Sequence, residues 1–404
     1  MIGKYCHVYT CKWFLSIMTG CFFLGGCVNT NSNTTSSQDI PIIDLAKNYP
    51  EKEFAMDDAD KEYIPLETTD DVLADSDFSI EYVSDNRIVG VNKNRGDVFV
   101  FGRDGKIISF FNHKGEGNIE YLSIQSFVFD EKAQEIFVAD QININRCMVY
   151  SENGNYLRQL NYPDSSWIAH IYNFDEHTLF AYNEYREGFD ADEINQKTPY
   201  VLLSKKDGSE FSRLDISFSK RRSARQRINL GEGITNASLV ISSYATKPTI
   251  KYGNEYIISD KSSDTVYLIT QNKKLTPLFV RTPTVFEENR LSTLSVYFKT
   301  DTHLFFNSFT YVWSEVTALI KKGQRPSFSN AKKIAYDIRT GQVFSVSNGP
   351  SGINDAPANT AVRVITADLL LDDLENGKLE GKLKQVAQSI DWDDNPVVEI
   401  VKYK

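Results

Sequence analysis

The feature that most constrains the fold of this chain is a hairpin phrase that occurs five times. Each copy has an apolar strand, a tight turn that is rich in Asn, Asp and Gly, and a second apolar strand. The first copy runs from Val98 to Phe101, turns at Asp104-Gly105 and continues through Ile107-Ile108. Because Asn-Gly and Asp-Gly supply the positive φ angles that a tight turn between twisted strands requires, each copy predicts a β-hairpin.

Four further copies follow at intervals that rise from about 50 to nearly 70 residues. Their turns lie at Asn153-Gly154, Asp207-Gly208, Asn272-Lys273 and Thr340-Gly341, with Lys273 in the place of the glycine. A four-stranded propeller blade takes roughly 40 to 50 residues, so the spacing predicts one blade for each hairpin, with insertions.

Further strand patterns complete the blades and close the ring. The segments 126–130 with 135–140, and 249–252 with 255–260, read as further strand pairs that would complete the blades. Near the N-terminus, Glu62–Leu66 reads as an edge strand because Pro65 has no N–H to donate, and the last alternating strand spans Pro396–Tyr403. Pairing these two end segments would remove the open edges of the array. We therefore predict an all-β, six-bladed propeller with four-stranded antiparallel blades.

Two leucine-rich stretches near the C-terminus, Thr366–Asn376 and Leu379–Ser389, predict a short helical insertion of one or two helices. They are too short for a separate domain, so we expect them to pack on the outside or over one end of the last blade. The predicted organisation is a signal peptide over 1–26, a flexible tether over 27–39 and the propeller over 40–404.

The N-terminal leader carries Lys4 and Lys12, then an almost wholly apolar run from Phe14 to Leu24, and ends at Gly25-Gly26-Cys27. The run is short of the roughly 20 apolar residues that a membrane-spanning helix needs. This order is typical of a secretory signal, and Leu24-Gly25-Gly26-Cys27 resembles the lipobox of bacterial lipoproteins. We predict lipidation at Cys27. The alternative is an ordinary cysteine near a conventional cleavage site.

Several segments carry a family resemblance: Tyr63–Thr68, the loop His113–Tyr121, the strand that ends at Asp140, and Asp394–Val398. They resemble the six-bladed propeller lipoproteins of Bacteroides-type bacteria, which are related to NHL and TolB-like propellers. Where that family usually has Pro-Gly in the loop, this chain has Asn118-Ile119. The resemblance implies a fold and a place in the cell envelope but no activity. Because no Asp follows Cys27, the outer membrane is favoured over the inner one, with the periplasmic or surface face left open.

The charge balance excludes some partners. The formal net charge is −10, and loss of Lys4 and Lys12 with the leader makes it two units more negative. This argues against nucleic acid and against electrostatic binding to anionic lipid. With the leader removed and Cys27 acylated, Cys147 is the remaining cysteine of the mature chain, and its apolar surroundings predict a buried small hydrophobe.

No motif predicts a catalytic residue, a cofactor or a metal. The histidines beyond the leader, at positions 113, 170, 177 and 303, have no metal-ligand spacing, although ligands in a propeller can converge from different blades. The Gly115-Glu116-Gly117 segment lacks the helix that follows a phosphate loop and is interpreted as a turn. Asp140 and Asp260 each end a strand and are interpreted as backbone caps.

Two groups of side chains are candidates for ligand binding. The basic run 220–227 supplies Arg221, Arg222, Arg225 and Arg227, which are suited to an acidic partner or a polyanionic glycan. The alternative is a solvated insertion loop.

The second group is aromatic. Trp167 and Tyr185, in aromatic-rich inserts that also contain Tyr182 and Trp313, are candidate platforms for sugar stacking. Packing in a blade core or at the rim is the alternative.

The leading hypothesis is a monomeric, non-enzymatic binding or scaffold module, anchored by lipid in the cell envelope and presenting one face of the propeller to a protein or carbohydrate partner. The competing hypothesis is an enzyme, a lyase or hydrolase with its site in the central channel, because the fold itself does not choose between them. Histidines and acids that converge in the channel would favour the enzyme.

Overall fold

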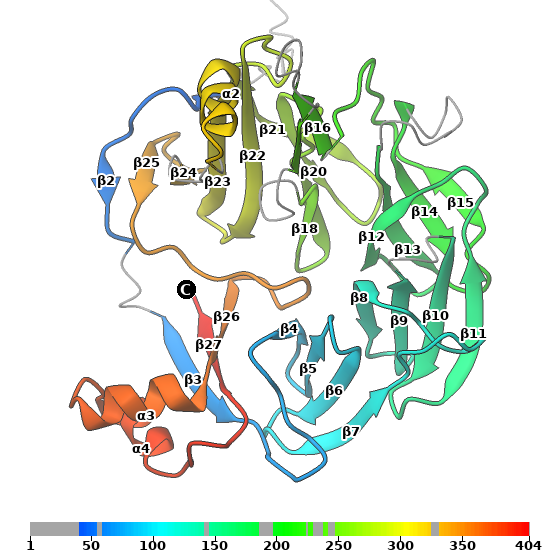
Figure 1. The fold of residues 1–404 in the computed structure, drawn as a ribbon, viewed down its shortest axis with the longest axis vertical. Coiled ribbons are helices and arrows are strands. Elements are labelled where there is room, and N and C mark those ends of the chain that lie inside the picture. Colours follow the sequence, from blue (N-terminus) through cyan, green and yellow to red (C-terminus); the bar gives the residue numbers. More distant parts are fainter. Residues whose placement is uncertain are drawn as a thin grey trace, which may run out of the picture. The chain divides into compact units, whose positions relative to one another are not determined.

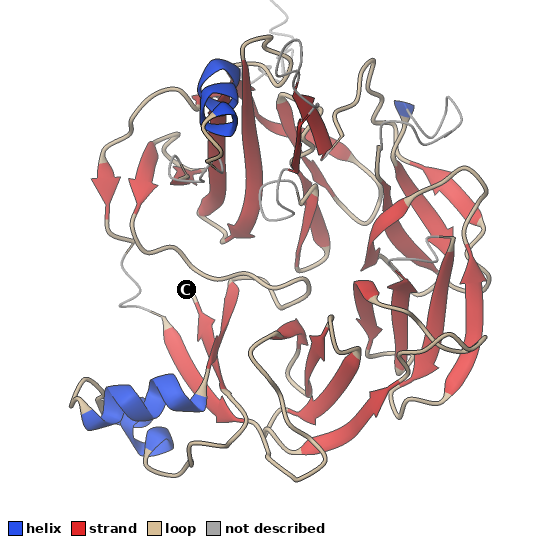
Figure 2. Ribbon diagram, viewed as in Figure 1, coloured by secondary structure: helices blue, strands red, loops and turns tan. Residues whose placement is uncertain are grey.

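The repeated hairpins become the third and fourth strands of successive blades. A computed structural model describes residues 40–54, 59–140, 145–185, 197–223, 225–228, 237–240, 247–324 and 331–403. Within these residues, six sheets of at least three strands surround a central channel (Figures 1 and 2). The predicted six-bladed β-propeller is confirmed.

Blades 1, 2 and 3 are four-stranded antiparallel sheets whose strands run outward from the channel in chain order. Blade 1 consists of β4 (Phe78–Val83), β5 (Arg87–Asn92), β6 (Asp97–Gly102) and β7 (Ile107–Asn112). Blade 2 consists of β8 (Ile124–Asp130), β9 (Glu135–Asp140), β10 (Arg146–Ser151) and β11 (Tyr156–Asn161). Blade 3 consists of β12 (Ile168–Asn173), β13 (Thr178–Asn183), β14 (Tyr200–Ser204) and β15 (Glu210–Arg213).

Blades 4 and 5 have the same four antiparallel strands and a fifth, parallel strand from the N-terminal segment at their outer edge. Blade 4 contains β18 (Thr249–Tyr252), β19 (Glu255–Ile258), β20 (Thr265–Ile269), β21 (Leu275–Thr282) and the added β1 (Ile42–Asp44). Blade 5 contains β22 (Arg290–Lys299), β23 (His303–Val312), β24 (Lys332–Asp337), β25 (Val343–Val346) and the added β2 (Glu51–Lys52). These two outer strands were not predicted from the sequence.

The two chain ends close the ring, as predicted. The closing blade consists of β26 (Thr360–Ile365), β27 (Val397–Lys402) and β3 (Asp60–Pro65), with β3 at the outer edge. Val398 pairs with Ile64, and Val397 pairs with Pro65. Among the described residues this blade has three strands, one fewer than the core of the other five.

The hairpin turn of blade 1 packs on the closing blade, which explains its glycine. Gly105 has φ +82°, and a Cβ there would lie 2.1 Å from the carbonyl oxygen of Pro65. The turn of blade 5 is free of such a neighbour, because a Cβ on Gly341 (φ +71°) would meet no atom of the described residues within 4 Å. In blade 4, Lys273 adopts the same left-handed conformation (φ +63°). This position accepts a side chain, and its ammonium lies over the ring of Phe211 of β15, 5.3 Å from the ring centroid.

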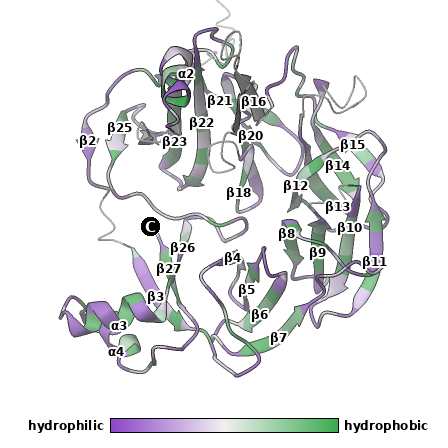
Figure 3. Ribbon diagram, in the orientation of Figure 1, coloured by the Kyte–Doolittle hydropathy of each residue, from purple (hydrophilic) through white to green (hydrophobic). Residues whose placement is uncertain are grey.

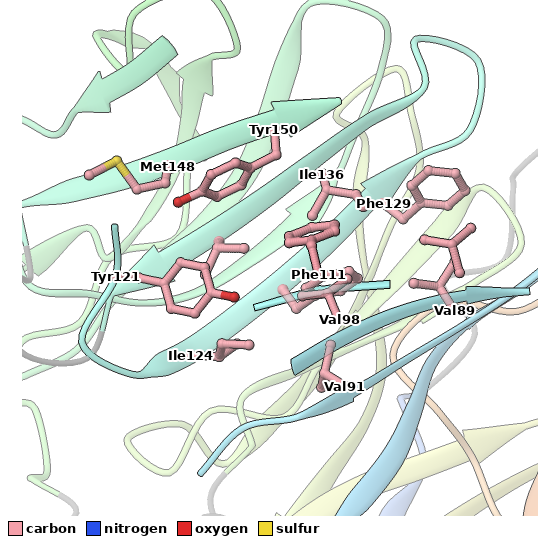
Figure 4. Packing of buried hydrophobic residues seen from close by; sticks show 13 residues of the cluster. Val89, Val91, Val98, Phe111, Tyr121, Ile124, Phe129, Ile136, Met148 and Tyr150 are labelled. Atoms are coloured by element: carbon pink, nitrogen blue, oxygen red, sulfur yellow. The ribbon is translucent and has the colours of Figure 1, made fainter. Parts of the chain in front are cut away.

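The cores lie between neighbouring blades. Figure 4 shows the seam between blades 1 and 2, where Val98 and Phe111 face Phe129 and Ile136. Because each middle strand packs against a blade on both faces, β5 and β9 are buried along nearly their whole length. Such strands read as almost continuous hydrophobic runs (Figure 3), and the outermost strands are more exposed.

The described helices are short. Helix α3 (Ala367–Glu375) and helix α4 (Gly381–Ala387) form the predicted C-terminal insertion between β26 and β27. The buried residues of α3 recur at helical spacing. Together with α4 they pack against Val397 and Tyr63 of the closing blade. Helix α2 (Trp313–Lys321), which the sequence analysis missed, follows β23, and a hairpin of β16 (Arg225–Ile228) and β17 (Ala237–Val240) lies between blades 3 and 4 along the chain.

Candidate functional site

The innermost strands of the blades line a central cavity of about 850 Å³. Side chains reach it from β4, β8, β12, β22 and β26, and blade 4 contributes Ile250 of β18 and Lys247 just before that strand. The walls combine apolar positions such as Ile124 and Val296 with hydroxyl and amide groups. The polar neutral residues are Ser79, Asn94, Ser123, Gln125, Ser126, Ser295, Asn307, Ser351 and Asn354. The charged residues are Glu81, Lys93, Lys247 and Arg363.

A loop of the chain crosses the channel and is attached to two blades (Figure 1). We call residues 351–357, between β25 and β26, the strap. The backbone of Asp355 bonds to β4 in both directions: its N–H donates to Glu81 O at 3.1 Å and its carbonyl accepts from Val83 N–H at 3.0 Å. Its carboxylate pairs with Lys251 of blade 4 at 2.6 Å. The strap is therefore held by backbone and charge contacts to blades that lie on different sides of the cavity.

A chain of polar side chains links blade 1, the strap and blade 4 along the cavity wall. Lys93 Nζ lies 2.7 Å from Glu81 Oε1. The other oxygen of Glu81 accepts a hydrogen bond from the side-chain amide of Asn354, whose carbonyl oxygen accepts one from Lys247 Nζ. The two lysines are thus joined through one buried carboxylate and one amide.

The positive charge of these lysines changes the pKa of groups beside them. Burial, with smaller contributions from the charges of Lys247, Lys261 and Lys93, lowers the pKa of His170 to about 3. Burial also lowers the pKa of Lys247 to about 8, against the opposing effect of Glu81 and with a smaller contribution from Lys93. At neutral pH, His170 is uncharged and most Lys247 side chains are protonated.

The four predicted arginines fall into two groups: Arg221 and Arg222 precede β16, and Arg225 and Arg227 lie on it. Arg221 is 8% exposed and donates from Nη2 to the hydroxyl of Tyr182 and to Asn183 O, both at 3.0 Å. Arg222 lies 5.1 Å from the ring of Phe286. The cation of Arg221 therefore belongs to the packing around blade 3. The interpretation of this part of the run as a solvated loop is wrong for Arg221, because aromatic and carbonyl partners bury it.

Trp167 and Tyr185 are not among the described residues that line the cavity. Arg225 and Arg227 lie on β16, and their side chains are outside the described residues. Trp167 is partly buried against the core of blade 3, and Tyr185 lies just after β13 with an intermediate exposure. Cys27, the leader and the tether also lie outside the described residues. Ligand binding at the arginines and aromatics stays a prediction.

The simpler interpretations of several other residues agree with the structure. Asp140 accepts from the backbone N–H of Leu122 at 3.2 Å, and Asp260 accepts from that of Ser262 at 2.7 Å. The Gly117 N–H donates to Glu120 at 2.8 Å, which holds that loop as a turn. Cys147 is fully buried, and burial raises its thiol pKa to about 12.

The residues that shape the cavity were not predicted as a site from the sequence. Glu81, His170 and Lys247 lie on or beside first strands of different blades, nearly 170 residues apart at the extremes. A usable signal was present at Glu81, which is the one charged residue of the innermost strand β4. Among the described residues, no group of three or more His, Cys, Asp and Glu is placed to hold a metal ion.

The comparisons with known proteins agree with the fold. A family model described as a domain of unknown function, DUF4934, matches residues 40–402. The chain belongs to this family. The DUF4934 chain is similar to a crystal structure from Bacteroides fragilis NCTC 9343, named as an exported protein, with a TM-score of 0.59 and 15% identity over 90% of this chain and 99% of that one.

A second solved structure, a member of the DUF4221 family from Bacteroides vulgatus ATCC 8482, has a TM-score of 0.45 and 9% identity, covering 87% of the DUF4934 chain and 99% of its own. The search of curated proteins returned no match. In the described part of the DUF4934 chain, no helix has the length and apolar character that crossing a membrane requires.

Proposed function

We propose that this protein is a cell-envelope binding module that takes a carbohydrate, or the exposed end of a glycan chain, into its central channel. The observation that carries the proposal is the cavity of about 850 Å³ into which all six blades contribute side chains. Its size lies within the roughly 300–1,000 Å³ that is typical of small-molecule sites. A rigid ring that presents side chains from six directions suits recognition of a ligand that does not need to react.

The character of the walls supports a polar ligand. Hydroxyl and amide side chains line the cavity together with apolar residues, and Tyr297 is among the lining residues. Sugars present hydroxyl groups at their edges and apolar C–H faces, so this mixture matches both of their surfaces. The strap adds Ser351 and Asn354 at one side.

The anchor and the location belong to the same proposal. We place a lipid on Cys27 and the protein at the outer membrane, supported by the leader with its Gly25-Gly26-Cys27 ending and by a structural relative that is named as exported. Kinship with NHL and TolB-like propellers stays a prediction.

The test of the anchor is a Cys27→Ser variant. We expect the wild-type protein in the membrane fraction with the mass of an acylated cysteine, and the variant without that mass. An unmodified wild-type Cys27 would remove the anchor from the proposal.

A matched pair of variants tests the channel. Gln125→Trp, on β8, fills the cavity, whereas Gln159→Trp, on the outer strand β11, makes the same change away from it. Wild-type protein in detergent and both variants are incubated with mono- to tetrasaccharides released from the cell's own surface polysaccharide, and retained species are identified by mass spectrometry.

We expect wild type and Gln159→Trp to retain the same species and Gln125→Trp to lose them. Equal retention by all three proteins, or retention by none, would contradict a channel site.

A further inference from the structure

The charges that line the cavity have the opposite sign to the chain as a whole. The formal net charge is −10, yet the charged lining residues are three cations, Lys93, Lys247 and Arg363, and one carboxylate, Glu81. Arg363 pairs with Glu399 at 2.7 Å, outside the lining, and Lys93 pairs with Glu81. Once these two pairs are set aside, the charge left on the wall is that of Lys247.

Lys247 differs from three other lysines that lie largely inside the fold. Lys205 lies 2.6 Å from Asp130, Lys251 lies 2.6 Å from Asp355, and Lys261 lies 2.5 Å from Glu184. Each of these three has a carboxylate partner. Among the described residues, the side-chain acceptor of Lys247 Nζ is the neutral amide oxygen of Asn354. A desolvated cation without an opposite charge is costly, so an anion placed beside it would be strongly favoured.

The described neighbours of Lys247 do not supply a negative charge for it alone, so a ligand could supply that charge. Asn354 uses its amide N–H on Glu81, and Glu81 is itself bonded to Lys93, so the carboxylate of the wall is already shared. His170 is neutral at physiological pH and adds no negative charge. The remaining polar groups of the wall are hydroxyls and amides.

We infer that the cavity selects carbohydrates that carry an acidic group, a carboxylate or a sulfate, and that Lys247 binds this group. The inference rests on the proposed function and names its ligand class. The hydroxyls of such a sugar would meet the neutral polar wall, and its acid would complete the polar chain that runs from Lys93 through Glu81 and Asn354. The lowered pKa of Lys247 agrees with this, because burial, which disfavours the charged form, outweighs the attraction of Glu81.

The test compares matched sugars by calorimetry on the full chain in detergent. D-galacturonate and D-galactose 6-sulfate carry the two acids, and D-galactose is the neutral reference. The variants are Lys247→Met, which removes the charge, Lys247→Arg, which keeps it, and Lys274→Met, which makes the same change on an exposed hairpin residue outside the cavity.

We expect wild type and Lys274→Met to bind one of the acidic sugars about 10- to 100-fold more tightly than galactose, the effect of one charge-assisted hydrogen bond. Lys247→Met should lose this preference and Lys247→Arg should keep part of it. A stronger response to the uronate or to the sulfate identifies which acid is recognised.

Equal affinity for acidic and neutral sugars, or a preference that survives in Lys247→Met, would overturn the inference and leave the binding function standing. If none of the three sugars binds while the channel still retains another saccharide from the surface polysaccharide, the inference fails alone. If nothing is retained in the channel, both fail.

Discussion

Two lysines at the same end of blade 4 show how the seams between blades differ from the channel. Lys247 precedes β18 and Lys261 follows β19, and these two strands pair antiparallel, with Thr249 opposite Ile258. Lys261 faces the seam with blade 3, where it bonds to Glu184 at 2.5 Å and to the hydroxyl of Tyr182 at 3.2 Å. Lys247 faces the cavity, where its acceptor is an amide.

The pKa values of the two lysines move in opposite directions for this reason. Burial lowers the pKa of both side chains, but the negative charge of Glu184, with contributions from Tyr182 and Asp260, raises the pKa of Lys261 above its ordinary range. At Lys247 the effect of burial wins, and the pKa falls to about 8. At the seam, Lys261 has a carboxylate partner. At the cavity, Lys247 has a neutral amide as its acceptor, and an anionic ligand would supply the opposite charge.

The largest expected effect is a difference in the free energy of unfolding between variants of the two lysines. Lys261→Met leaves Glu184 buried without its cation and should lower the free energy of unfolding by about 3–5 kcal/mol. Lys247→Met removes a cation that lacks a carboxylate partner and should change it by about 1 kcal/mol or less. Urea unfolding followed by circular dichroism measures both. A similar loss of unfolding free energy in the two variants would contradict the difference between Lys261 at the seam and Lys247 at the cavity.

A smaller effect concerns the seam that closes the ring. Gly105→Ala places a methyl group against Pro65 O, whereas Gly341→Ala places one in open space at nearly the same φ. Both variants lose roughly 1 kcal/mol to the left-handed conformation, and Gly105→Ala should lose about 1–3 kcal/mol more through overpacking. Thermal unfolding of the two variants distinguishes them. Equal losses would mean that the blade 1 turn does not pack on β3.

The smallest expected effect is the pH dependence of binding in the channel. The groups that face Lys247 are Glu81 and Lys93 from blade 1, His170 from blade 3 and Asn354 from the strap. An anion binds the protonated lysine, so affinity for D-galacturonate should be level below pH 8 and fall as pH rises from 8 to 10, by at most about tenfold per unit.

His170, with a pKa of about 3, is uncharged throughout this range and cannot cause the fall. The control is Lys247→Arg, in which the guanidinium stays charged and the affinity should not fall over the same interval. An identical pH profile in wild type and this variant would assign the dependence to another group.

The sequence predicted the seams far better than the channel. The hairpin turns and the strand that ends at Asp140 could be predicted because turn chemistry and period-two hydrophobicity are local. The pairing of Ile64 with the C-terminal strand could be predicted because closing the ring removes the open edges of the array. The buried role of Arg221 could not, since its partner Tyr182 lies 39 residues away. Glu81, Lys247 and Asn354 meet only after the ring closes, and nothing local marks the strap that carries Asn354.

The pKa of Lys247, measured together with that of Lys261, most directly tests the claim that Lys247 lacks a carboxylate partner and binds an acidic sugar. NMR of the protein with ¹³C-methylated lysines, titrated with and without D-galacturonate, follows both side chains in one sample. We expect Lys247 to titrate near 8 in the free protein and at a higher pH with the sugar acid, while Lys261 stays charged throughout in both. A Lys247 that titrates at the ordinary value of 10.5 and does not respond to the sugar acid would contradict the account.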